Sequence, residues 1–178
     1  MSLEEAEIQI LKFFNKPFFP LLNLAFAVII FSIYAYILGI IFLFYRKKEV
    51  KKAIHLIASL LIGMAFVVSL KFIVGRERPY VSHEDINYFF TKADPSFPST
   101  HAFVALLCLC FIPKDFSVWL KILIIFYLVI LIPIGSLYIG VHYPSDVIVG
   151  GLLGLLFPKA INEEISVKIF KKIFRISP

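Results

Sequence analysis

The chain has 178 residues, of which 60% are hydrophobic and only 17% are charged, and its mean hydropathy is +0.91. Average soluble domains are about 45–50% apolar even when glycine is counted, so this composition excludes an ordinary soluble domain and predicts an integral membrane protein. The formal net charge is +6, but the cations flank apolar runs, which argues against a nucleic acid as partner.

The first 16 residues predict an amphipathic helix. Leu3, Ile10 and Phe13 share one helical face, whereas Glu7 and Lys12 lie on the other. Such a helix is typical of the membrane interface. The chain opens with acidic rather than basic residues, so we expect no cleaved signal peptide.

Long apolar runs follow, and about 20 apolar residues suffice to cross the hydrocarbon core. We expect about five transmembrane helices, at roughly 18–45, 50–73, 99–113, 117–140 and 144–160, of which the third and fifth are short. The fold class is therefore an all-α polytopic membrane helix bundle plus the N-terminal interfacial helix. We expect a single domain over residues 1–178, with the interfacial helix at 1–16, the bundle at 17–160 and a basic cytoplasmic tail at 161–178.

The loop charges predict the orientation of this bundle. If all five helices cross, 12 of the 18 cations lie on one side, and the positive-inside rule places that side in the cytoplasm. The loops at 74–98 and 141–145 then face outward together. We expect a multi-pass protein of the bacterial inner membrane whose active site faces the periplasm or exterior.

The outward loops carry polar residues where apolar helices end. Lys71, Arg76 and Arg78 close the second span, and cations there can also be explained as snorkelling side chains at the interface. Their neighbours favour a site, because the polar ends of two further spans face the same side of the membrane.

Two of those spans begin with histidines. Ser99, Thr100 and His101 open the third, where free backbone N–H groups and the helix dipole favour an anion, although a serine there can also be a simple N-cap. His142 precedes Asp146 by four residues, so the carboxylate can orient the imidazole. A metal site built from both histidines and Asp146 is the alternative, but the nearby cations would repel a divalent ion. Together these groups indicate a phosphate site.

The motifs resemble those of a known family. Three motifs in this chain are similar to the three signature motifs of the type 2 phosphatidic acid phosphatase (PAP2) superfamily, membrane branch. The first is Lys71 followed, after six intervening residues, by Arg78-Pro79; the second is Pro98-Ser99-Thr100-His101; the third is His142 followed, after three intervening residues, by Asp146. The order and spacing agree over residues 71 to 146. The closest resemblance is to small bacterial lipid A 1-phosphatases and undecaprenyl-diphosphate phosphatases.

The chain departs from the family pattern at two places. Thr100 stands where glycine is usual, and Gly135-Ser136 stands where Ser-Arg is usual. Loss of that arginine removes a bidentate phosphate ligand. Arg76 is our candidate for its replacement.

The resemblance implies a mechanism and its residues. His142 would attack phosphorus to form a phosphohistidine, Asp146 would orient it, and His101 would protonate the leaving oxygen. Phosphate would be held by Lys71, Arg78, Ser99, Thr100 and Arg76. No metal or other cofactor and no obligate protein partner are expected; the partner is the membrane lipid substrate.

Several functions remain open on the sequence. Lipid A 1-phosphate and undecaprenyl diphosphate are the leading substrates, and phosphatidylglycerophosphate is an alternative. A catalytically silent relative that binds anionic lipids is a further alternative, favoured by Ser136. We also expect Gly150 and Gly154 to let the fifth span pack closely inside the bundle.

Overall fold

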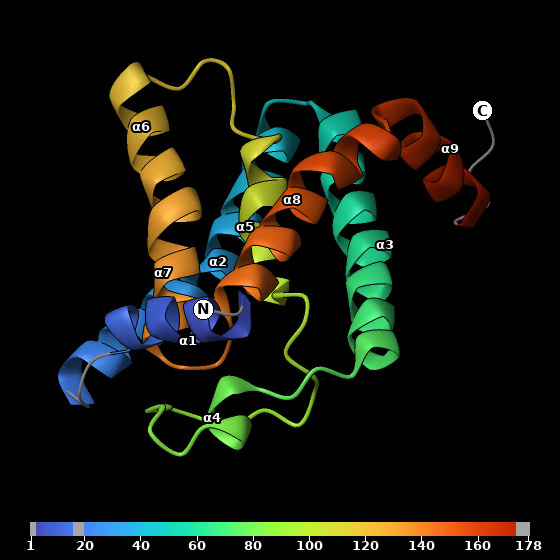
Figure 1. Cartoon of the computed structure of the whole chain (residues 1–178). Helices are drawn as coiled ribbons and strands as arrows, with labels where there is room; N and C mark the ends of the chain where they lie inside the picture. The colour runs from blue at the N-terminus through green and yellow to red at the C-terminus, as the bar shows by residue number, and fades with distance from the viewer. Residues whose placement is uncertain (1–2, 16–19, 174–178) are drawn as a thin grey trace.

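The computed structural model describes residues 3–15 and 20–173, and these residues form helices and connecting loops without a strand (Figure 1). The elements are α1 (Leu3–Phe14), α2 (Pro20–Arg46), α3 (Val50–Val74), α4 (Pro79–Ser82), α5 (Thr100–Leu109), α6 (Val118–Phe126), the π-helical segment η1 (Tyr127–Leu131), α7 (Ile132–Tyr138), α8 (Pro144–Ala160) and α9 (Glu163–Ile173). The predicted all-α class is confirmed. The expected boundary at residues 16–17 lies outside the described residues.

Helix length supports fewer than five crossings. Within the described residues, three helical stretches are long and apolar enough to span a membrane, at Pro20–Arg46, Val50–Ser82 and Val118–Tyr138. Helices α8 and α9 would add a fourth if the pair counts as one span, although it bends by 76°. Helix α5 has only 10 residues, about 15 Å of helix, which is half the hydrocarbon thickness.

Apolar side chains divide between a core and an outer surface. Ile33, Leu56 and Phe103 lie in the buried cluster that joins the long helices. In contrast, Phe72 is 67% exposed and Trp119 is 78% exposed. Exposed side chains of this size on long apolar helices are suited to contact with acyl chains rather than water.

One end of the bundle gathers the polar loops. The C-terminal end of α3, the N-terminal ends of α5 and α8, the loop containing α4 and the helix α1 all lie at the lower end in Figure 1. Gly75 ends α3 with a positive φ of 64° and donates its N–H to the Lys71 carbonyl at 2.8 Å. This turn directs the chain away from the span and into the long loop that carries Arg76 and Arg78.

Helices α5 and α8 pack against each other with their backbones in close contact. A Cβ atom on Gly150 would lie 2.4 Å from the Ser99 carbonyl oxygen, and one on Gly154 would lie 2.2 Å from the Phe103 carbonyl oxygen. Both distances are too short for any side chain. The expected close packing of these glycines inside the bundle is confirmed.

Replacing Gly154 with alanine should therefore destabilise the protein. The added methyl group would push α8 away from α5, and overpacking of this kind typically costs about 1–3 kcal/mol. Gly39→Ala is the matched control, because Gly39 is also helical and an added Cβ would meet nothing within 4 Å. We expect the melting temperature in detergent to fall in Gly154→Ala and not to fall in Gly39→Ala. Equal melting temperatures for both variants would contradict the packing argument.

Candidate active site

The two cations of the first motif are buried and share one carboxylate. Lys71 and Arg78 are 1% and 2% exposed. Lys71 Nζ lies 3.2 Å from one oxygen of Asp94, and Arg78 Nη2 lies 2.8 Å from the other. Burying a charge without a partner is very costly, so Asp94 stabilises both cations. Burial raises the pKa of Asp94, but the charges of Lys71 and Arg78 outweigh it and hold that pKa below its usual value.

Backbone carbonyls attach these cations to the other two motifs. Lys71 Nζ donates to the Pro95 carbonyl at 2.7 Å, just before the second motif. Arg78 Nη1 donates to the carbonyl of Val141 at 2.7 Å, directly before His142. The long loop after α3 is thereby fixed against the beginnings of α5 and α8.

His142 and Asp146 form a buried pair. Their atoms Nδ1 and Oδ2 are 3.4 Å apart, and the side chains are 1% and 0% exposed. The Asp146 oxygen Oδ2 also accepts a hydrogen bond from Ser96 Oγ and one of 2.9 Å from the Tyr143 N–H. Burial lowers the pKa of His142 to about 4, although Asp146 opposes the shift. The imidazole is therefore neutral at pH 7, the form in which it can act as a nucleophile.

His101 extends from the first turn of α5 and is only 5% exposed. Its Nε2 atom is buried and has no hydrogen-bond partner among the described residues. The Phe31 ring meets the imidazole edge to face, with centroids 5.7 Å apart. A buried ring nitrogen without a partner is costly unless a bound group supplies one.

The N-terminus of α5 presents backbone donors. Ser99 caps the helix, since its Oγ accepts from the Ala102 N–H at 3.4 Å, and its own N–H donates to the Asp146 carbonyl at 2.9 Å. The N–H groups of Thr100 and His101 precede the first intrahelical bond, from Phe103 to Ser99. Such N-terminal N–H groups are available to an anion.

Arg76 lies apart from the other two cations of its loop. Its Nη1 donates to Ser145 Oγ at 2.7 Å and to Asp146 Oδ1 at 2.9 Å, and its Nη2 donates to Glu7 Oε2 at 2.7 Å. The guanidinium carbon also lies 3.8 Å from the centre of the Tyr143 ring. Arg76 was expected to replace the missing phosphate-binding arginine, but its terminal nitrogens instead donate to acceptors of the protein. Ser136, which stands in place of the usual arginine, is buried and donates to the Ile132 carbonyl at 3.1 Å.

Three residues of the site were missed by sequence reasoning. Ser96 bonds Asp146, Asp94 pairs with Lys71 and Arg78, and Lys92 lines a pocket with Arg78 and Asp94. Their signal was the polar stretch KADPS directly before the second motif. The sequence could not show which of these side chains turn inward, because the loop has no helical period.

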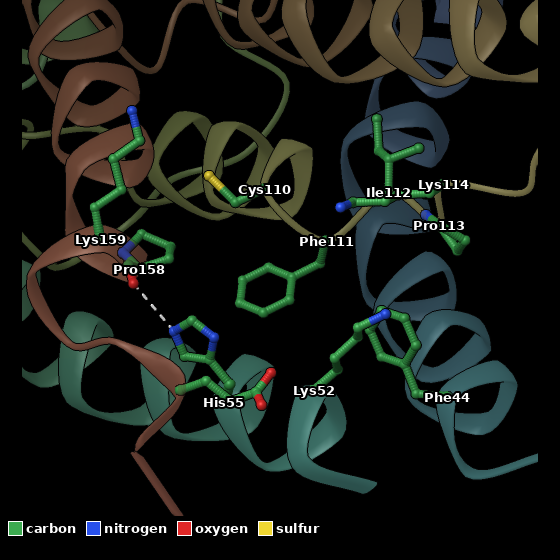
Figure 2. A pocket seen from close by; sticks show the side chains of 11 residues that line it. Phe44, Lys52, His55, Cys110, Phe111, Ile112, Pro113, Lys114, Pro158 and Lys159 are labelled. Atoms are coloured by element: carbon green, nitrogen blue, oxygen red, sulfur yellow. Dashed lines mark hydrogen bonds between the residues drawn. The ribbon is translucent and has the colours of Figure 1, made fainter. Parts of the chain in front are cut away.

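A cavity of about 450 Å³ lies at the opposite end of the bundle and contains none of the predicted site residues (Figure 2). It is formed by the N-terminal end of α3 and the C-terminal ends of α5 and α8. His55 lines it, with Nε2 3.0 Å from the Pro158 carbonyl oxygen and its ring against Phe111. Within the described residues, no group of three or more His, Cys, Asp and Glu side chains is arranged to hold a metal ion.

Known proteins share this arrangement. Residues 52–163 match the sequence profile of the PAP2 superfamily. The chain belongs to that superfamily. This assignment confirms the resemblance that the three motifs indicated, since the matched segment includes all of them.

Two curated relatives of this PAP2 protein are similar over most of it. YbjG of Escherichia coli K12, a candidate undecaprenyl-diphosphatase, is 29% identical over 135 residues, which are 72% of this chain and 64% of that protein. An uncharacterized protein of Methanocaldococcus jannaschii is 35% identical over 142 residues, 72% of this chain and 56% of that protein. The chain thus spans less than two thirds of the length of either relative.

Two solved structures share the fold. LpxE of Aquifex aeolicus superposes with a TM-score of 0.75 at 30% identity, covering 94% of this chain and 99% of that one. A transmembrane PAP2-type phosphatidylglycerolphosphate phosphatase from Bacillus subtilis superposes with a TM-score of 0.71 at 22% identity, covering 98% and 89%. The latter likeness concerns the fold alone.

The buried neutral His142 should make the protein less stable in mild acid. In the unfolded chain its pKa is about 6.5, whereas burial lowers it to about 4 in the folded protein. Between these pH values only the unfolded state binds the extra proton. The free energy of unfolding therefore has its full value, as far as His142 is concerned, above about pH 6.5 and declines as the pH falls toward 4. We expect His142→Gln to reduce the drop in melting temperature between pH 7 and pH 5.

His83→Gln is the control for that comparison, because His83 is a partly exposed histidine of the same end of the bundle. It should melt with the same pH dependence as the wild type. Identical pH dependence in the wild type and in His142→Gln would show that His142 is not held neutral.

Proposed function

We propose that this protein is a membrane lipid phosphatase that removes a phosphate from a lipid phosphate or diphosphate through a phosphohistidine on His142. The observation that carries the proposal is the geometry of two histidines. His142 is backed by Asp146, while the buried Nε2 of His101 lacks a partner among the described residues. Buried cations of the same site, Lys71 and Arg78, supply the positive charge that a phosphate requires.

His142 would be the nucleophile. Its Nδ1 faces Asp146, which leaves Nε2 free to attack phosphorus. As the P–N bond forms, the bond from phosphorus to the lipid oxygen breaks, and the imidazole acquires positive charge that the Asp146 carboxylate stabilises. Water then attacks the phosphohistidine, the P–N bond breaks, and inorganic phosphate leaves.

His101 would be the general acid. A proton on its Nε2 would pass to the departing lipid oxygen, and the same nitrogen would then take a proton from the attacking water. The missing partner of this atom would thus be the substrate itself.

Lys71, Arg78 and the backbone N–H groups at the start of α5, near Ser99 and Thr100, would hold the phosphate oxygens. Their donors stabilise the charge that spreads over these oxygens in the transition state. Asp94 already engages both cations, so a bound phosphate must share or displace that carboxylate. The cations would remain buried and neutralised in both states.

The substrate class follows from depth and from the relatives. The N-terminus of the short helix α5 can reach the level of lipid headgroups without the substrate leaving the bilayer. Undecaprenyl diphosphate is favoured by the name of the Escherichia coli relative. Lipid A 1-phosphate offers the same chemistry, with phosphatidylglycerophosphate as the alternative. The loop charges support an inner-membrane location with the site outward.

We further infer that Lys92, rather than Arg76, supplies the cation that the third motif lacks. Lys92 lines a pocket at this end of the bundle together with Arg78 and Asp94. Burial, with a contribution from Arg78, lowers its pKa to about 8 although Asp94 opposes the shift. Its backbone is fixed by Tyr80, whose hydroxyl accepts from the Lys92 N–H at 2.8 Å.

The proposed reaction is tested by phosphate release from purified protein in detergent containing EDTA. The three lipids are offered side by side. We expect release from at least one of them, and loss of turnover by orders of magnitude in His142→Ala. His55→Ala is the control, since His55 lies at the opposite end of the bundle and should keep activity.

Activity in His142→Ala would contradict the covalent scheme, and activity that EDTA abolishes would contradict metal-free catalysis. No release from any lipid by folded protein would favour the silent lipid-binding relative instead.

The Lys92 inference predicts a pH dependence of phosphate binding. Lys92 is charged below its lowered pKa of about 8 and loses that charge as the pH rises. The inhibition constant of inorganic phosphate should therefore rise from pH 7 to pH 9. We expect this rise to be about three- to tenfold larger in the wild type than in Lys92→Arg. Lys12→Arg, on the surface of α1, should behave as the wild type. An equal pH effect in Lys92→Arg would contradict the inference.

A further inference from the structure

A chain of alternating charges runs from the N-terminal helix to the reactive histidine. Glu7 on α1 bonds Arg76, Arg76 bonds Asp146, and Asp146 faces His142. The three contacts measure 2.7, 2.9 and 3.4 Å. Glu7 lies outside the three motifs, and Arg76 is one of the six unspecified residues between Lys71 and Arg78 of the first motif.

Glu7 holds both Arg76 and the start of α8. While Oε2 accepts from the guanidinium, Oε1 accepts from the Ser145 N–H at 2.8 Å. The Ser145 N–H belongs to the first turn of α8, where backbone donors lack intrahelical partners. One carboxylate therefore fixes the helix turn that carries Asp146 and the cation that touches it.

Arg76 in turn holds the oxygen of Asp146 that His142 does not use. It contacts Oδ1, whereas His142 contacts Oδ2. The guanidinium is planar and lies against the Tyr143 ring at 3.8 Å, so its orientation is restricted. With both oxygens engaged, the carboxylate cannot rotate away from the imidazole.

The rest of α1 is built to keep Glu7 in place. Leu11 is fully buried against Ala102, Leu137 and Val147, which belong to α5, α7 and α8. At the end of the helix, Asn15 Nδ2 donates to the Tyr138 carbonyl at 2.8 Å. These contacts fix α1 on the site, beyond the interfacial role that its amphipathic face predicts.

Glu7 also balances charge. Without it, the charge of Arg76 would be balanced by Asp146 alone, which would weaken the support that this carboxylate gives to an imidazolium at His142. Arg76 and Glu7 thus have opposite electrostatic effects on His142, although they act through the same contact.

We propose that Glu7 and Arg76 are positioning residues that hold Asp146 against His142, so that the N-terminal helix is a working part of the catalytic centre. This proposal rests on the function proposed above for the same site.

The test compares Glu7→Gln and Arg76→Gln with the matched control Glu4→Gln in the full chain in detergent. Glu4 is an exposed acid of the same helix. We expect kcat to fall by about ten- to a hundredfold in the first two variants, as for misplaced catalytic groups, with KM and the inhibition constant of inorganic phosphate nearly unchanged. Glu4→Gln should match the wild type.

A purely structural role would not predict the pH profiles. The acidic limb of kcat/KM should move to lower pH in Glu7→Gln, which leaves a cation uncompensated near His142, and to higher pH in Arg76→Gln, which removes that cation. The charges of Lys71 and Arg78 also act on His142 but are the same in all variants.

Weaker inhibition by phosphate in Arg76→Gln, with kcat unchanged, would overturn the proposal and make Arg76 a phosphate ligand. Unchanged kcat and unchanged limbs in both variants would also overturn it. The titration of His142 can be followed by NMR of histidine-labelled protein without turnover. If the wild type releases no phosphate but Glu7→Gln and Arg76→Gln shift the His142 titration in opposite directions, the positioning roles would be supported and the proposed function contradicted.

Discussion

The close contact between α5 and α8 determines the geometry on which the site depends. Glycines on α8 leave no side chain between the two backbones, so Gly150 meets the carbonyl of Ser99 directly. The same approach lets the Ser99 N–H donate to the carbonyl of Asp146. Two helix N-termini are thereby joined at one end of the bundle, and His101 and His142 project from neighbouring backbones. A side chain at Gly150 would separate the two halves of the site.

Charge pairing explains how so many ionised groups can be buried in an apolar protein. Lys71 and Arg78 share Asp94, and Arg76 lies between Glu7 and Asp146. Removing one charged side chain from such a buried group of ion pairs leaves an uncompensated charge. This costs far more free energy than losing an exposed ion pair. The buried charges therefore hold one another in place, and a phosphate would have to share or displace Asp94 to reach Lys71 and Arg78.

The proposed replacement for the missing third-motif cation lies in the loop before α5. Ser136 turns back to the carbonyl of its own helix and offers no cation. The loop before α5 instead places Lys92 in a pocket that Arg78 and Asp94 also line. The sequence could not indicate this position of Lys92, because a cation inside an irregular loop has no periodicity that predicts the direction of its side chain. Arg76, which lies close to Arg78 in the chain, was the natural candidate, yet its guanidinium is engaged by Glu7, Ser145 and Asp146, whereas Arg78 pairs with Asp94.

The sequence by itself determined the membrane class, the helical spans near their observed bounds and the three motifs, because hydrophobic length and motif spacing are local properties. It also predicted that the motifs meet at one end, on the expectation that all five helices cross the membrane. Only the tertiary structure decided which polar side chain faces which. Glu7 and Asp146 are 139 residues apart in the chain and are joined through Arg76 solely because α1 packs against α8. Such a contact arises from packing between distant helices, which no local pattern encodes.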